Sequence, residues 1–213
     1  AAAEQQGRAV SASRDVVVIE NGGGNVASVR FALERLGVQA ELTHDAARIR
    51  RATHVILPGV GAARDAMQRL DAAGLVDVVP SLTQPVLGIC LGMQLLFESS
   101  AEGETRCLGI LPGRAERFAD APDRPVPHMG WNELQRVSDS PLLDGIGDGE
   151  YAYFVHSYAL PVGDHTVATS TYGAPFSAVV GRGNFHGAQF HPERSSRTGS
   201  RLLANFLALP SAA

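Results

Sequence analysis

A fully apolar run near the start of the chain places the strongest constraint on the fold. Residues Val16-Val17-Val18-Ile19 are all β-branched, and a glycine-rich segment follows them at 20–25. A strand that faces solvent on one side alternates apolar and polar residues, so an unbroken run indicates a strand covered on both faces. Strands of this kind occur in parallel sheets that lie between two layers of helices. The run therefore predicts a layered α/β fold.

Strand-like and helix-like segments alternate through the first half of the chain. Apolar residues recur at helical spacing from Val26 to Leu36, and Gly37 then stands where a helix C-cap is expected. Further strands are expected over 38–43, 53–57 and 85–89, and further helices over 62–70 and 91–99. This alternation predicts an open, mostly parallel sheet of the flavodoxin-like, doubly wound kind, flanked by helices in three layers.

The second half of the chain has a different pattern. Strands separated by turns are expected between 108 and 195, most clearly over 151–160, 167–172, 176–180 and 185–190, with a hairpin turn at 181–184. A helix is expected over 201–209. We therefore predict one domain over residues 15–209, with additional antiparallel strands in its second half. Residues 1–14, which lack the apolar core of a signal peptide, and residues 210–213 are expected to be tails.

Composition excludes several classes of function. The 213 residues include 18 basic and 22 acidic side chains, a net charge of −4, whereas general nucleic-acid binders are normally basic. All basic residues are Arg, so the chain has no lysine for a Schiff base or a P-loop. Two cysteines do not make a disulfide framework, and no apolar run approaches the roughly 18 residues of a membrane span. We expect a cytoplasmic protein.

A cysteine between two glycines is the strongest candidate for chemistry. The segment Gly88-Ile89-Cys90-Leu91-Gly92 lies between a predicted strand and a predicted helix, as in a nucleophile elbow. A helix N-terminus favours the thiolate and offers N–H groups to an oxyanion. We therefore predict that Cys90 is a nucleophile, and the alternative is a small buried core residue. Cys107 has no such surroundings and is expected to be structural.

A cysteine nucleophile needs a base and a group that orients the base. In Phe190-His191-Pro192-Glu193, an extended chain would place the imidazole and the carboxylate on one side. His156 is the alternative base. The loop Pro58-Gly59-Val60-Gly61 is a third candidate site, because ligands bind at the carboxyl ends of strands in open α/β sheets, although it could also be an ordinary turn.

Cofactor sites have little support. Neither Cys-x-x-Cys nor His-x-x-x-His spacing occurs, so no metal site is expected. Gly22 and Gly24 match the start of a dinucleotide-binding motif, but Ala27 stands where its third glycine belongs. We expect an enzyme without a metal or other cofactor.

Two of these segments together resemble the class I glutamine amidotransferase family: Gly88-Ile89-Cys90-Leu91-Gly92-Met93-Gln94 and Gly187-Ala188-Gln189-Phe190-His191-Pro192-Glu193. The resemblance runs from residue 16 to residue 209. It implies that a triad of Cys90, His191 and Glu193 hydrolyses the side-chain amide of glutamine. It also implies an oxyanion hole at Gly59, Val60 and Leu91, and glutamine contacts from Gly61, Gln94, Glu102, Ser157 and Tyr158.

Segments at 55–62, 127–132 and 153–158 are similar to the branch of this family that serves histidine biosynthesis. The resemblance implies that ammonia passes to a cyclase/synthase subunit with a (β/α)₈ barrel, in a heterodimer with one copy of each subunit. Asn25, Trp131 and Asn132 match the side that faces this partner. The family usually reads Asp-Tyr-Gly-Met-Gly-Asn where this chain has 20–25, and this departure concerns docking, not the triad.

Three other functions stay open at this point. The chain could be a glutaminase that serves another synthase, which a partner-exchange assay would reveal. It could be a stand-alone cysteine hydrolase or thioesterase, which would turn over esters or peptides without a partner. It could also be a binding module of the same fold, and Cys90 would then be inert toward alkylating agents.

Overall fold

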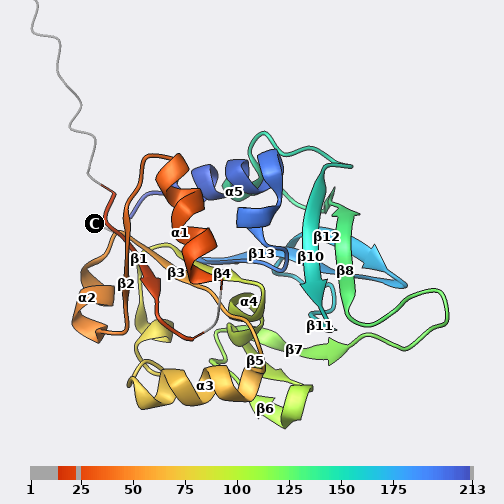
Figure 1. Cartoon of the computed structure of the whole chain (residues 1–213), viewed down its shortest axis with the longest axis horizontal. Helices are drawn as coiled ribbons and strands as arrows, with labels where there is room; N and C mark the ends of the chain where they lie inside the picture. Colours follow the sequence, from red (N-terminus) through yellow and green to blue (C-terminus); the bar gives the residue numbers. More distant parts are fainter. Residues whose placement is uncertain (1–13, 23–24, 212–213) are drawn as a thin grey trace, which may run out of the picture.

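The computed structural model describes residues 14–22 and 25–211 (Figure 1). The tail expected over 1–14 therefore lies outside the described residues except for Arg14. The described residues also leave out Gly23 and Gly24, which belong to the loop expected to face a partner. They leave out residues 212 and 213 of the expected C-terminal tail as well.

An eight-stranded mixed sheet forms the centre of the molecule, in the order β2-β1-β3-β4-β14-β13-β12-β9. The first five of these strands run parallel: β2 (Ala40–Thr43), β1 (Val16–Ile19), β3 (His54–Leu57), β4 (Val86–Ile89) and β14 (Phe185–Ala188). The other three are antiparallel: β13 (Ala174–Arg182), β12 (Thr166–Tyr172) and β9 (Gln135–Arg136). The predicted open, mostly parallel sheet with antiparallel strands from the second half is confirmed.

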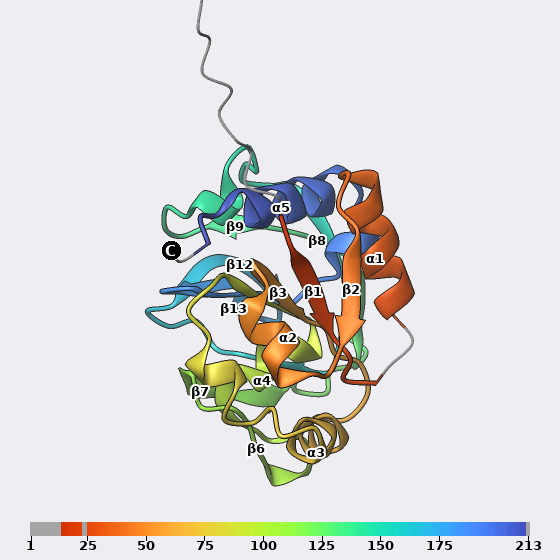
Figure 2. The same cartoon turned by 90° about the vertical axis from the view of Figure 1, so that its left-hand side faces the viewer.

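Helices cover both faces of the parallel half. Helices α1 (Val26–Arg35) and α5 (Ser196–Ala208) lie on one face, and α2 (Ala46–Arg51), α3 (Ala63–Ala72) and α4 (Leu91–Leu95) lie on the other (Figure 2). In β1, Val16 and Val18 belong to the core under α1 and α5, whereas Val17 and Ile19 belong to the core under α2 and α3. The unbroken apolar run is thus the signature of a strand buried on both sides.

Two smaller sheets lie outside the main sheet. Strands β8 (His128–Glu133) and β10 (Tyr151–His156) form an antiparallel pair that stands apart from the main sheet (Figure 1). The other small sheet has the order β11-β7-β5-β6, made of β11 (Tyr158–Ala159), β7 (Leu111–Arg117), β5 (Phe97–Ser100) and β6 (Thr105–Arg106). Within the part of the chain that the structure describes, four 3₁₀ turns complete the elements: η1 (Val79–Ser81), η2 (Glu102–Glu104), η3 (Pro141–Leu143) and η4 (Pro192–Arg194).

Several expected boundaries were wrong. The helix expected over 91–99 ends at Leu95, because residues 97–100 form β5 and pair with β7 and β6. The strand expected over 151–160 breaks at Ser157, where the chain passes from one small sheet to the other. Strand β14 ends at Ala188 instead of 190, and helix α5 begins at Ser196 instead of 201. Helix α2 was not predicted, since it is short and buries only Ile49.

The strand order reverses between β1 and β3, because β2 lies on one side of β1 and β3 and β4 lie on the other. Loops that leave the carboxyl ends of strands at such a switch point border the usual ligand-binding crevice. The loop after β1 begins at Glu20, the loop after β3 covers 58–62, and the cysteine turn follows β4. The topology therefore brings the glycine-containing loop at 58–61 and Cys90 to one edge of the sheet.

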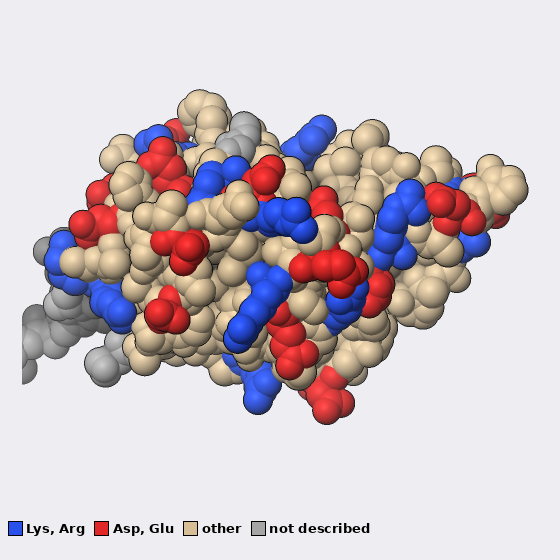
Figure 3. Space-filling view, turned by 90° about the horizontal axis from the view of Figure 1, so that it is seen from below, with Lys and Arg blue, Asp and Glu red and all other residues tan. Residues whose placement is uncertain are grey.

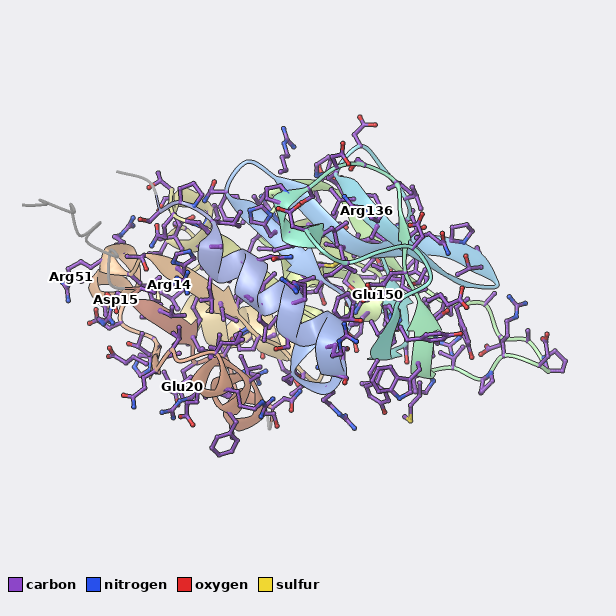
Figure 4. All side chains as sticks on the ribbon, turned by 90° about the horizontal axis from the view of Figure 1, so that it is seen from above. Arg14, Asp15, Glu20, Arg51, Arg136 and Glu150 are labelled. Carbon is purple, nitrogen blue, oxygen red and sulfur yellow. The ribbon has the colours of Figure 1, made fainter. Side chains whose placement is uncertain are left out.

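Charged side chains are dispersed over the surface. On the face in Figure 3, acidic and basic side chains are interspersed and do not form a patch of one sign. In Figure 4, Arg14, Asp15, Glu20 and Arg51 lie around the parallel half of the sheet, while Arg136 and Glu150 lie toward the antiparallel half. None of the helices in the described residues is long and apolar enough to cross a membrane.

Candidate active site

Cys90 occupies a tight turn between β4 and α4. Its backbone has φ +53° and ψ −114°, a conformation that side-chain-bearing residues rarely adopt. The glycines around it allow close backbone contact, because a Cβ on Gly92 would lie 1.9 Å from the carbonyl oxygen of Leu57. A Cβ on Gly88 would lie 2.6 Å from the carbonyl oxygen of Gly92. The turn thus has the strained, glycine-flanked geometry of a nucleophile elbow.

His191 follows β14, the strand next to β4, and its ring is buried beside Cys90. Its backbone N–H donates to the carbonyl of Tyr153 at 3.0 Å, which ties the histidine to β10. Its Nδ1 lies 2.8 Å from Oε1 of Glu193, whose side chain is almost fully buried. Glu193 lies in the turn η4 and not in an extended segment as predicted, yet the two side chains still meet.

The electrostatics of the site favour the protonated form of His191. Burial lowers the pKa of His191, but Cys90 and Glu193 beside the ring outweigh burial and raise this pKa to about 10. His156 shows the opposite behaviour, because burial lowers its pKa to about 3. Both ring nitrogens of His156 are also engaged, one with Tyr158 and one with His128. His191 and not His156 is therefore the histidine equipped to hold a proton beside the thiol.

A cavity of about 280 Å³ opens in front of Cys90 and His191. Its walls include every residue expected to contact glutamine, namely Gly61, Gln94, Glu102, Ser157 and Tyr158. Val60 and Leu91 also line it, whereas Gly59 lies behind and borders a smaller hollow together with Asn25 and Glu193. A volume at the lower end of the range for small-molecule sites suits a compact metabolite.

Hydrogen bonds hold the polar side chains of this cavity. Nε2 of Gln94 donates to the carbonyl of Tyr158 at 2.9 Å and to Oε1 of Gln189 at 3.0 Å. Oε2 of Glu102 accepts from the backbone N–H of Ala63 at 3.0 Å, which fixes the carboxylate at the rim.

Two residues near the thiol were missed by sequence analysis. Nε2 of Gln189 and the carbonyl oxygen of Val155 each lie 3.8 Å from Sγ of Cys90. Gln189 lies two residues before His191, inside a segment that carried the family resemblance, so that segment already contained the signal. Val155 acts through its backbone, for which a single sequence offers no signal.

The three residues expected at a partner face have different surroundings. Trp131 is 53% exposed, on the same outward side of β8 and β10 as the exposed residues Met129 and Tyr151. Asn132 points inward, and its Nδ2 donates to the carbonyl of Thr171 at 2.9 Å. Nδ2 of Asn25 donates to Oε1 of Glu193 and lies 3.1 Å from Nδ1 of His191, so this residue contacts the triad.

Among residues 14–22 and 25–211, no three His, Cys, Asp or Glu side chains gather in a group that could hold a metal ion.

Comparison with known proteins places this geometry in context. The sequence model of the family described as "Glutamine amidotransferase class-I" matches residues 17–209. The imidazole glycerol phosphate synthase subunit HisH of Xanthomonas axonopodis pv. citri is 56% identical over 193 residues, which cover 91% of this chain and 96% of that protein. The subunit HisH of Xylella fastidiosa (strain Temecula1) is 52% identical over 198 residues, covering 93% and 99%.

Solved structures agree at the level of the fold. A crystal structure of a glutamine amidotransferase superposes with a TM-score of 0.70 at 22% identity and covers 90% of this chain and 96% of its own. The structure of PurLQS from Thermotoga maritima also has a TM-score of 0.70, at 19% identity, with coverage of 91% and 97%.

Proposed function

The chain belongs to the class I glutamine amidotransferase family, and on this premise we propose that it hydrolyses the side-chain amide of glutamine and supplies the ammonia to histidine biosynthesis. The observation that carries the proposal is the cavity in which Cys90 and His191 face Gln94 and Glu102, in a chain 56% identical to a HisH subunit. The chain is then the glutaminase subunit of an imidazole glycerol phosphate synthase.

The reaction proceeds through a covalent intermediate. The thiolate of Cys90 attacks the side-chain carbonyl carbon of glutamine and forms a carbon–sulfur bond. Backbone N–H groups around Val60 and Leu91 stabilise the tetrahedral oxyanion. His191, which carries a proton at neutral pH, donates it to the nitrogen as the carbon–nitrogen bond breaks. Ammonia leaves, and a glutamyl thioester remains on Cys90.

Water completes the cycle. Neutral His191 takes a proton from water, the resulting hydroxide attacks the thioester, and glutamate leaves as the thiolate is restored. Glu193 orients the ring of His191 through the contact at Nδ1 and stabilises its charged form. This mechanism assigns the catalytic triad to Cys90, His191 and Glu193.

The remaining wall of the cavity binds glutamine. The carboxylate of Glu102 attracts the α-ammonium group of the substrate, because it lies at the rim with one oxygen anchored on Ala63. Gln94 holds the segment at Ser157 and Tyr158 through its bond to the Tyr158 carbonyl. Gly61, with φ +85°, gives the facing loop a turn that a side-chain-bearing residue would adopt only with strain.

The ammonia passes to a cyclase partner. We place a (β/α)₈-barrel cyclase subunit, one per chain, against the outward side of β8 and β10, where Trp131 and Met129 are exposed. The partner consumes ammonia to close an imidazole ring and yields imidazole glycerol phosphate and an aminoimidazole carboxamide ribonucleotide. Asn132 lies on β8 itself with its side chain toward His128, and Asn25 contacts Glu193 of the triad.

The proposal extends to domain limits and location. The amidotransferase domain covers residues 15–209, because the strands and helices that build the site lie between Val16 and Ala208. Cys90 and Cys107 are both free thiols, which suits a reducing cytoplasmic compartment.

The test is glutamate release from glutamine, measured with and without a purified cyclase subunit and its nucleotide ligand. We expect stimulation by the partner, loss of activity in Cys90→Ala and full activity in the matched control Cys107→Ala, since Cys107 is buried outside the cavity. Activity that ignores the partner would assign the chain to another synthase. Absence of glutamate release under all conditions would refute the glutaminase assignment.

A further inference from the structure

Two buried histidines outside the triad face each other across the small sheet of β8 and β10. His128 and His156 are register partners in this antiparallel pair, and Nδ1 of His128 lies 2.9 Å from Nε2 of His156. Both rings are almost fully buried. The mechanism above uses neither of them, although His156 lines the glutamine cavity.

The neighbours of this pair determine the direction of each hydrogen bond. Nδ1 of His156 lies 2.9 Å from the carbonyl oxygen of Tyr158, which can only accept, so Nδ1 carries the hydrogen. Burial lowers the pKa of His156 to about 3 and that of His128 to about 4, so both rings are neutral. Nε2 of His156 therefore accepts, and Nδ1 of His128 donates to it.

The far end of the chain of bonds is Asn132. Its Oδ1 accepts from the backbone N–H of Glu133 at 2.8 Å, which settles the orientation of the amide. Its Nδ2 donates to the carbonyl of Thr171 and lies 3.3 Å from Nε2 of His128, the remaining acceptor of that ring. All bonds thus point the same way, from Asn132 to His128, to His156 and to the Tyr158 carbonyl.

Aromatic rings hold the histidines in these orientations. His128 stacks on Tyr172, with ring centroids 4.2 Å apart and planes at 27°, and on Phe154 at 5.2 Å. Phe118 packs edge-on against both histidines. Such packing leaves little freedom for either ring to turn, and it makes a charged ring costly.

The near end of the chain of bonds reaches the substrate cavity. The carbonyl of Tyr158 accepts two hydrogen bonds, one from His156 and one from Gln94. Ser157 and Tyr158 line the cavity, and Ser157 is the residue at which the backbone leaves β10 and enters β11. The relay therefore ends at the point where the cavity wall passes from β10, which pairs with β8, to β11, which pairs with β7.

We propose that Asn132, His128 and His156 form a one-way hydrogen-bond relay that positions the Tyr158 carbonyl, and with it Gln94, for glutamine binding. These three are positioning residues, because they act through the Tyr158 peptide and not on the reacting atoms. The relay begins one residue from the exposed Trp131, so the strand that carries the proposed partner surface also determines how glutamine is held. The proposal rests on the proposed function and deepens it.

The first test uses the unaltered chain. We expect the imidazole ¹⁵N shifts at pH 7 to show His128 and His156 as neutral rings with the hydrogen on Nδ1. A ring with its hydrogen on Nε2, or a charged ring, would overturn the relay without any substitution. This measurement does not depend on whether variants fold.

The second test separates binding from chemistry in the complex with the cyclase. His128→Phe keeps an aromatic ring but removes the donor to His156, and we expect the KM for glutamine to rise about tenfold, equivalent to about 1.4 kcal/mol, with kcat nearly unchanged. His128→Asn offers an amide N–H near the position of Nδ1 and should restore most of the KM. The matched control is His186→Phe, because His186 is buried in β14 outside the relay and the cavity.

The outcomes are distinguishable. If the unaltered complex hydrolyses glutamine and His128→Phe has a normal KM, the relay is refuted while the proposed function stands. If His186→Phe raises the KM as much as His128→Phe does, the effect is general destabilisation and the relay is again refuted. If the unaltered complex releases no glutamate, the proposed function fails first, and the relay loses its assigned substrate with it.

Discussion

The backbone of Cys90 leads to a stability prediction that distinguishes strain from burial. With φ +53° and ψ −114°, this residue occupies a region that glycine visits freely and other residues enter at a cost of about 1–3 kcal/mol. Cys90→Gly should release that strain, whereas Cys90→Ala should keep it. Both variants lose the thiol and therefore the activity, so stability can be compared between two equally inactive proteins.

The second cysteine provides the reference for all other effects. Cys107 is 5% exposed and Cys90 is 7% exposed, but Cys107 is not among the residues with positive φ. Replacing Ala by Gly at a buried position removes a methyl group and adds backbone freedom to the unfolded chain, which together cost roughly 1–2 kcal/mol. These losses are common to both positions. The Ala-to-Gly change in the free energy of unfolding at residue 90 minus the same change at residue 107 therefore isolates the strain.

The expected result is a double difference in the free energy of unfolding. The change from Ala to Gly should be more favourable at residue 90 than at residue 107 by about 1–3 kcal/mol, which is the strain alone. For a chain of this length each kcal/mol moves the melting temperature by about 2–4 °C, so the double difference should reach several degrees. Urea unfolding followed by circular dichroism measures it for all four variants. A double difference of zero or of opposite sign would refute the interpretation that the turn is strained.

Three further predictions concern the same site. The pKa of His191 is raised to about 10, so kcat/KM for glutamine should stay level from pH 7 to 9 and fall toward pH 10. A fall of kcat/KM near pH 7 would contradict the assignment of His191 as the group that donates the proton. Because this pKa lies above the unfolded value near 6.5, the same shift stabilises the fold fully below pH 6.5, and that stability is lost as pH rises through about 10. Gly92→Ala should destabilise the fold by about 1–3 kcal/mol and lower kcat, because the new Cβ would lie 1.9 Å from the Leu57 carbonyl. Gly147→Ala, whose Cβ would meet nothing closer than 3.9 Å, is the control, and equal melting temperatures of these two variants would argue against the close packing of α4 on β3.

Local sequence patterns were sufficient to predict the parallel half of the fold. The apolar run at β1, the helical spacing after it and the glycine at residue 37 each depend on residues a few positions apart, and each has the expected structure. The cysteine turn is local in the same sense, because Gly88, Cys90 and Gly92 lie within five residues. Residues 97–99 were predicted as helix for the converse reason, since the strand β5 that contains them exists only through pairing with β6 and β7.

The sequence by itself determined the layered α/β class, the cysteine elbow and the pairing of His191 with Glu193. Each of these features depends on residues that lie a few positions apart in the chain, because strand burial, turn geometry and short spacings are local properties. Only the tertiary structure decided which distant groups meet. Gln189 reaches Cys90, Asn25 reaches Glu193 and His128 reaches His156 because sheet order and register bring together residues separated by between 28 and 168 positions. Such contacts depend on where whole elements pack, and the free energy of that packing belongs to the buried core as a whole and not to any local pattern.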